Sequence, residues 1–276
     1  MPRTSPTSRT KPARKPRKPR KPGATRARSE LRAAGITGRQ PTTIPLVWLS
    51  TVIGFFLLAP AWISTETFFT CFRRVAVHQQ FWLSEECWFF LLGTVLWLIA
   101  FFGLPRPLVI YVFGHELTHA LWVWMMGGRV SDFRVSRNGG HIVSDKHNFL
   151  IALAPYFFPL YSIAVIAAYG AGSLFTNMEP YHRLLYALIG VTWAFHLSFT
   201  LWMIPKGQTD LTYYGTFFSL VIIYLMNLGV LTLLLVIASP RVSWRGLGLE
   251  WLRHAHAFAQ WVILMARAAR MALGKG

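Results

Sequence analysis

Long apolar runs dominate the chain and recur from residue 45 onward. Each run is rich in Leu, Ile, Val, Phe and Trp, and is about as long as the roughly 20 residues that a helix needs to cross ~30 Å of hydrocarbon. The pattern therefore predicts an all-α polytopic membrane protein with about six transmembrane helices. The predicted spans are residues 45–66, 86–104, 107–126, 149–172, 183–204 and 211–238.

The loop between the third and fourth runs has a different periodicity. Apolar and polar residues alternate along "RVSDFRVSRNGGHIVSDK", on either side of Asn138-Gly139-Gly140. Asn-Gly is a strong hairpin turn signal, because both residues accept positive φ. We therefore expect a small β-hairpin over 128–145 at the membrane edge. An exposed strand edge there could receive an extended peptide as an added strand.

The N-terminal segment, residues 1–43, has no apolar periodicity. It holds 13 of the 28 Lys and Arg residues and a single acid, Glu30, around the repeat "KPARKPRKPRKP". Dense like charge with many prolines predicts a disordered tail. Such a tail could serve only as a topology anchor, could contact anionic lipid, or could bind nucleic acid. Nucleic acid is disfavoured, because no aromatic residues interleave with the basic ones for base stacking.

The C-terminal segment, residues 241–276, follows the transmembrane domain of residues 44–240. Its apolar residues are interrupted by Arg253, Arg267 and Arg270. Arginines at this density disfavour a span, and the pattern predicts an interfacial amphipathic helix over 246–272.

Composition and charge agree with a membrane protein. Of the 276 residues, 54% are hydrophobic and only 14% are charged, against ~25% charged in an average soluble domain. With six spans, 21 Lys and Arg fall on the side of the termini and 7 on the other, so we expect cytoplasmic termini in the cell (inner) membrane.

Cys71 and Cys87 flank one predicted loop, and a disulfide between them requires that the loop face an oxidising space.

The third run, "YVFGHELTHALWVW", contains three ionisable residues in its centre. His115 and His119 are four residues apart and share one face of a helix, which suits tetrahedral zinc. Glu116 between them completes an HExxH motif, in which the Glu acts as general base. Ionisable groups in a span are costly and usually functional. The alternative is a pair of hydrogen-bonded core histidines beside a neutral Glu.

A catalytic zinc site needs a third protein ligand. Asp132 and Asp145 lie in the predicted hairpin, where solvated turn residues are common. Asp210 instead lies in "WMIPKGQTDLTYYG", between two apolar runs and just after Pro205 and Gly207. Irregular backbone at membrane depth is tolerated where it lines a cavity. Asp210 is therefore the predicted third ligand; it could also, or instead, cap a helix.

Together these motifs resemble the site-2 protease family of intramembrane zinc metalloproteases. That family carries HExxH in one span and an Asp ligand in a later "NxxPxxxxLDG"-type segment, which "PKGQTD" resembles through Pro205 and Asp210. "GGH" at 139–141 and "ALAPYFFP" at 152–159 resemble the family's hairpin and following span. The resemblance implies an endopeptidase for membrane-protein or peptide substrates. Its zinc would be held by His115, His119 and Asp210, with Glu116 as the catalytic base.

The chain departs from the family at two positions. Trp202 stands where the family has an Asn thought to contact substrate, and Leu211 replaces the Gly after the Asp. His196 in the fifth run and Asn148 before the fourth are candidates for the missing Asn, while the role of His141 stays open. The alternative function is a catalytically inactive protein of the same fold that binds partner helices or acts as a scaffold.

Overall fold

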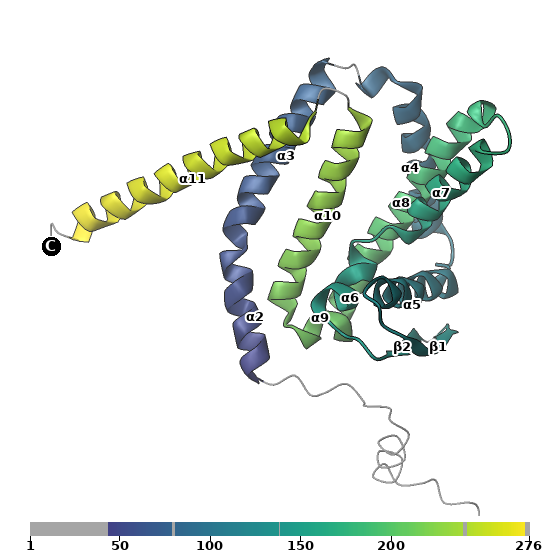
Figure 1. The fold of residues 1–276 in the computed structure, drawn as a ribbon, viewed down its shortest axis with the longest axis horizontal. Helices are drawn as coiled ribbons and strands as arrows, with labels where there is room; N and C mark the ends of the chain where they lie inside the picture. The colour runs from purple at the N-terminus through teal and green to yellow at the C-terminus, as the bar shows by residue number, and fades with distance from the viewer. Residues whose placement is uncertain (1–43, 79–80, 138, 240–241, 274–276) are drawn as a thin grey trace, which may run out of the picture. The chain divides into compact units, whose positions relative to one another are not determined.

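The computed structural model describes residues 44–78, 81–137, 139–239 and 242–273, and this part of the chain is mostly helical (Figure 1). The predicted disorder of residues 1–43 lies outside the described residues. The long helices are α2 (Ile44–Phe56), α3 (Leu58–His78), α4 (Glu85–Gly103), α5 (Leu108–Met125), α7 (Leu160–Ser173), α8 (His182–Met203), α10 (Thr216–Ala238) and α11 (Trp244–Leu273). The short elements are α6 (Phe149–Leu153), α9 (Thr209–Tyr213), strands β1 (Val130–Ser136) and β2 (Gly139–Ser144), and the 3-10 turns η1 (Phe81–Leu83), η2 (Ala154–Tyr156), η3 (Glu179–Tyr181) and η4 (Ile204–Lys206).

Several helices of the described chain are long and apolar enough to cross a membrane, which suggests a membrane protein. Four segments meet this condition: Leu46–Val77, Glu85–Gly103, Glu179–Lys206 and Thr216–Ile237. A fifth would result if α6, η2 and α7 together formed one span. The prediction of six spans is therefore not confirmed. The predicted span 107–126 corresponds to α5, which is not among these segments, because two histidines and a glutamate interrupt its apolar sequence.

The predicted span 149–172 is broken rather than continuous. Its two halves, Phe149–Tyr156 and Leu160–Ser173, are bent by 77° relative to each other. Pro155 and Pro159 lie at the break, and neither can donate a backbone hydrogen bond to continue the helix. Asn227 of α10 donates a hydrogen bond of 3.0 Å to the carbonyl of Tyr156, which satisfies an acceptor that the break leaves open.

Helices α4 and α8 pack closely through two glycines. A Cβ atom at Gly93 would overlap the carbonyl oxygen of Ala187, and one at Gly190 would overlap the carbonyl oxygen of Phe90. Small residues at such positions let two helix backbones approach within a membrane, where packing rather than hydrophobicity drives association. The segment that connects α8 to α10 begins at the end of this helix pair, and it contains Asp210.

The predicted hairpin is confirmed as a two-stranded antiparallel sheet that packs on α5. Phe133 pairs with Ile142, and Ser136 pairs with Gly139, so the turn lies one residue earlier than the Asn-Gly pair suggested. Gly139 has a φ of 125° and belongs to β2. Residue 138 itself lies outside the described residues.

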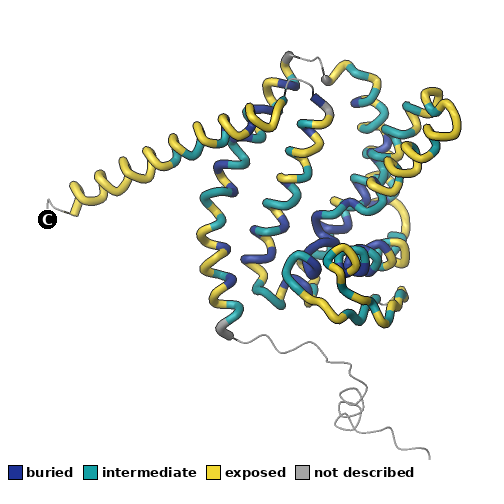
Figure 2. The backbone as a smooth tube through the Cα atoms, in the orientation of Figure 1, coloured by how far each residue is buried: buried dark blue, intermediate teal, exposed yellow. Residues whose placement is uncertain are grey.

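Helix α11 runs through the whole predicted amphipathic segment as one helix of 30 residues. Near its start, the buried carboxylate of Glu250 lies 3.4 Å from Arg74 of α3 and 3.2 Å from Arg253. The rest of α11 is mostly exposed (Figure 2). Its interfacial position stays a prediction.

Cys71 and Cys87 are both buried and free, so the structure has no disulfide between them.

The most deeply buried part of the described chain surrounds the broken segment. Leu153, Ala154, Tyr156 and Phe157 form one core cluster with residues of α9 and α10. In Figure 2 the buried backbone gathers where these elements meet α5. This core fixes α5, α6 and α9 against one another, and these are the elements that carry the candidate site.

Candidate metal centre

The two histidines of the HExxH motif converge as their spacing predicts. His115 and His119 lie on one face of α5, one helical turn apart. Their Nε2 atoms are 3.3 Å apart, and their rings are nearly perpendicular, at 84°. Two imidazole nitrogens are therefore presented to a common point.

Asp210 joins them from a distant part of the sequence. Its Oδ2 atom lies 3.2 Å from Nε2 of His115 and 3.5 Å from Nε2 of His119. The carboxylate is buried, with a residue exposure of 7%. Within the described residues, these three side chains form the one group that could hold a metal ion.

A sharp turn delivers Asp210 to the site. After α8, the 3-10 turn η4 contains Pro205, and Gly207 then adopts the left-handed conformation with φ of 71°. Gln208 occupies the N-cap of α9, and Asp210 lies inside its first turn. The alternative that Asp210 is the N-cap residue is therefore wrong.

The arrangement of the three atoms fits tetrahedral zinc. Bonds of about 2.0–2.1 Å at tetrahedral angles place any two ligand atoms about 3.3 Å apart. The three separations here are 3.2, 3.3 and 3.5 Å. These separations are compatible with three ligands of such an ion, and two nitrogens with one carboxylate oxygen are donors that zinc accepts.

Backbone contacts fix the orientation of His119. Its Nδ1 donates a hydrogen bond of 2.8 Å to the carbonyl of Ile151. Because a carbonyl only accepts, this bond places the proton on Nδ1 and leaves the Nε2 lone pair facing the site. Asn148 caps α6, since its Oδ1 accepts a hydrogen bond of 2.8 Å from the Ile151 N–H. Asn148 therefore positions the residue that holds His119.

The surroundings of His115 are aromatic. Nδ1 of His115 lies 3.3 Å from the hydroxyl of Tyr111, one turn earlier in α5. The ring of Tyr156, at the helix break, stands edge-on to the imidazole with centroids 5.5 Å apart. Sequence reasoning missed both tyrosines. The spacing of Tyr111 from His115 was a usable signal, whereas no local pattern indicates Tyr156 or the carbonyl of Ile151.

Glu116 is buried next to the hairpin and is not one of the three clustered residues. It follows His115 by one residue and so lies about 100° around the helix. A Cβ atom at Gly140 of β2 would come within 2.6 Å of the Glu116 Cγ atom. The lack of a side chain at Gly140 therefore lets the hairpin pack directly against the Glu116 side chain.

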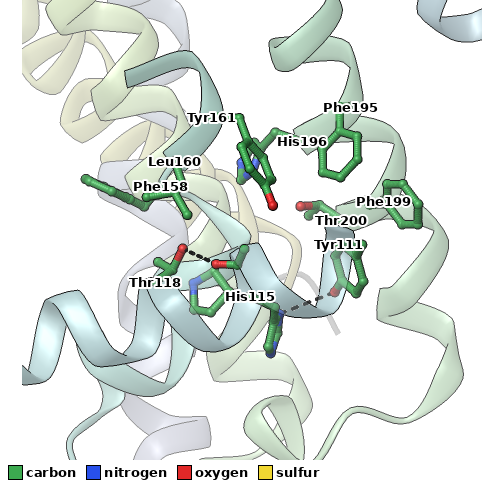
Figure 3. Close-up of a pocket in the computed structure, with 12 residues that line it drawn as sticks. Tyr111, His115, Thr118, Phe158, Leu160, Tyr161, Phe195, His196, Phe199 and Thr200 are labelled. Atoms are coloured by element: carbon green, nitrogen blue, oxygen red, sulfur yellow. Dashed lines mark hydrogen bonds between the residues drawn. The ribbon is translucent and has the colours of Figure 1, made fainter. Parts of the chain in front are cut away.

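The other candidate residues lie outside the cluster. His141 points from β2 toward Asp132, at 3.6 Å, and is exposed. Trp202, which stands at the family's Asn position, is covered by the Lys206 ammonium, 2.9 Å from the ring centroid. His196 of α8 lines a small cavity that His115 also lines (Figure 3).

Comparison of the chain with protein-family models, with curated proteins and with solved structures finds no match in any of the three.

Proposed function

We propose that this protein is a zinc metalloendopeptidase of the site-2 protease type, which hydrolyses peptide bonds of substrates within or beside the membrane. One observation carries the proposal: the donor atoms of His115, His119 and Asp210 are separated by 3.2 to 3.5 Å. These residues would hold the ion. A bound zinc ion would supply Lewis acidity, which activates water and polarises a peptide carbonyl.

Glu116 supplies the proton transfer in this proposal. Its carboxylate accepts a proton from the attacking water and then delivers it to the leaving amine. Burial supports this role, because a buried side chain packed against the hairpin keeps a defined position. Asp210 and the two histidines have no proton-transfer role here; they hold the metal.

The hairpin gives the substrate a place to bind. A substrate helix must unwind before its peptide bonds become accessible, and a two-stranded sheet can hold the unwound segment as an additional strand. Because Gly140 lies against Glu116, a strand added to this sheet would run close to the proposed base. The substrate class is accordingly a membrane protein or peptide.

The proposal includes a location and an orientation in the membrane. The excess of Lys and Arg at the two ends favours cytoplasmic termini, and the cell (inner) membrane is the proposed location. The basic segment 1–43 would contact anionic lipid headgroups of that membrane.

The decisive test is the Glu116→Gln variant of the full-length purified protein. Zinc content is measured by elemental analysis, and cleavage is followed with a quenched fluorescent single-span peptide in proteoliposomes. We expect about one zinc per chain in both proteins and a loss of cleavage of about 10²- to 10⁴-fold in the variant, the usual contribution of a general base. Glu179→Gln, at an exposed position in η3, is the matched control and should keep full activity. Cleavage by Glu116→Gln at the wild-type rate, or wild-type protein without stoichiometric zinc, would refute the proposal.

A further inference from the structure

A small cavity lies between α5, α7 and α8, and His115 is part of its wall (Figure 3). Its volume is about 30 Å³. A buried water needs roughly 10–15 Å³ of such space, together with two to four polar partners, so the cavity has room for about two water molecules.

One residue of the cavity wall, His196, has a buried nitrogen without a hydrogen-bond partner among the described residues. The Nε2 atom of His196 is buried and has no hydrogen bond to any described residue. Buried polar nitrogens in folded proteins are nearly always paired with protein or with ordered water, because an unmade bond costs the full desolvation of the group. Since no group of the described chain pairs with this nitrogen, a small polar ligand such as water would satisfy it.

Oxygen atoms of neighbouring side chains can complete the coordination of such a ligand. The hydroxyl of Tyr161 donates to the carbonyl of Ile110 at 2.6 Å, and the hydroxyl of Thr118 donates to the carbonyl of Gly114 at 2.7 Å. Each hydroxyl still has lone pairs with which to accept a hydrogen bond. Thr200, also buried, adds a third hydroxyl to the lining.

We propose that this cavity is a water-binding site, in which His196 Nε2 and the hydroxyls of Thr200 and Tyr161 hold one or two water molecules beside His115. The volume favours a ligand as small as water, and Phe195 and Phe199 make part of the remaining wall apolar. The site has a further role that rests on the proposed function. It keeps water next to a hydrolytic centre, which apolar helices would otherwise separate from solvent. His196 acts there as a positioning residue.

Hydroxyl-radical footprinting tests the site without reference to activity. A short X-ray pulse in H₂¹⁸O generates radicals from water inside the protein, and mass spectrometry locates the labelled side chains. Phe199 and Phe157 form a matched pair, because both are at most 1% exposed, yet only Phe199 lines the cavity. We expect labelling of Phe199 well above that of Phe157. Equal labelling of the two rings in the wild-type protein would overturn the proposal.

Two variants then connect the water to named side chains. His196→Phe removes the nitrogen and fills the space, while Thr200→Val removes one hydroxyl at nearly constant volume, which keeps the test valid if the first variant does not fold. We expect both to lower Phe199 labelling, to leave the zinc content unchanged and to reduce cleavage by roughly 3- to 10-fold, the factor that one hydrogen bond typically carries. Labelling that persists in both variants would refute the role of these residues.

The outcomes separate this site from the proposed function. Preferential labelling of Phe199 in a protein that binds no zinc and cleaves nothing would support the water site and refute the protease. Glu116-dependent cleavage in a protein whose Phe199 is labelled no more than Phe157 would support the protease and refute the water site.

Discussion

The Oδ2 atom of Asp210 lies 3.2 Å from Nε2 of His115, although 95 positions separate the two residues in the chain. This contact joins α9 to the centre of α5. It depends on the anchoring of α9, where Leu211 is buried and its carbonyl accepts a hydrogen bond of 2.9 Å from Ser219 of α10. The position of Asp210 in the candidate site is thus fixed by packing in the core rather than by the loop that precedes α9.

Replacing Asp210 with Ala should abolish stable metal binding. We expect zinc affinity to fall by more than about 100-fold, since even the hydrogen-bonding partners of metal ligands contribute about 10- to 100-fold. Competition with a calibrated chelator measures this value. Asp132→Ala is the control, because Asp132 is a half-exposed hairpin residue paired with Arg134. Equal zinc affinity of the two variants would remove Asp210 from the ligand set.

Removing the cap of α6 should weaken the site indirectly. In Asn148→Ala the Ile151 N–H loses its acceptor, which should lower the free energy of unfolding by about 0.5–2 kcal/mol. The Ile151 carbonyl that holds His119 then becomes less well positioned, so zinc affinity should fall about 10-fold. Asn148→Asp keeps the capping oxygen and should retain near wild-type affinity. If both variants lose zinc equally, the capping explanation is wrong.

A side chain at Gly140 should displace either the hairpin or Glu116. The added Cβ would come within 2.6 Å of the Glu116 Cγ and 2.7 Å of the Arg134 carbonyl oxygen. In Gly140→Ala we expect cleavage to fall by up to about 100-fold, as displacements near 1 Å can do, with zinc retained. Gly170→Ala is the comparison, because a Cβ at this helical position meets no atom within 4 Å. Full activity of Gly140→Ala would mean that the hairpin does not position the base.

The α4–α8 contact should tolerate no side chain at Gly190. A methyl group there would overlap the carbonyl oxygen of Phe90, so Gly190→Ala should lower the free energy of unfolding by about 1–3 kcal/mol. Thermal denaturation in detergent measures this loss. Gly229→Ala in α10, where a Cβ has open space, should instead leave stability unchanged or raise it by about 0.5–1 kcal/mol. A wild-type melting temperature for Gly190→Ala would contradict the close packing.

The number of membrane-length helices was only partly predictable. Apolar composition alone identified the helices now seen as α4, α8 and α10, because a long apolar run has few alternatives to a helix. The same composition could not reveal that the predicted span 149–172 bends by 77°. Pro155 and Pro159 indicated a weak point, but the bend also needs a partner for the freed carbonyl of Tyr156, which Asn227 provides from α10.

For the site, the sequence by itself determined what lies within one helical turn. The convergence of His115 and His119, and the separate direction of Glu116, follow from helix geometry alone. The sequence also supplied Asp210 as a candidate, but only the tertiary structure decided that its carboxylate reaches both imidazoles. Only the fold, likewise, placed the Ile151 carbonyl behind His119 and a small cavity beside His115. The reason is physical: local spacing fixes directions along one helix, whereas contacts between distant segments depend on how buried side chains pack.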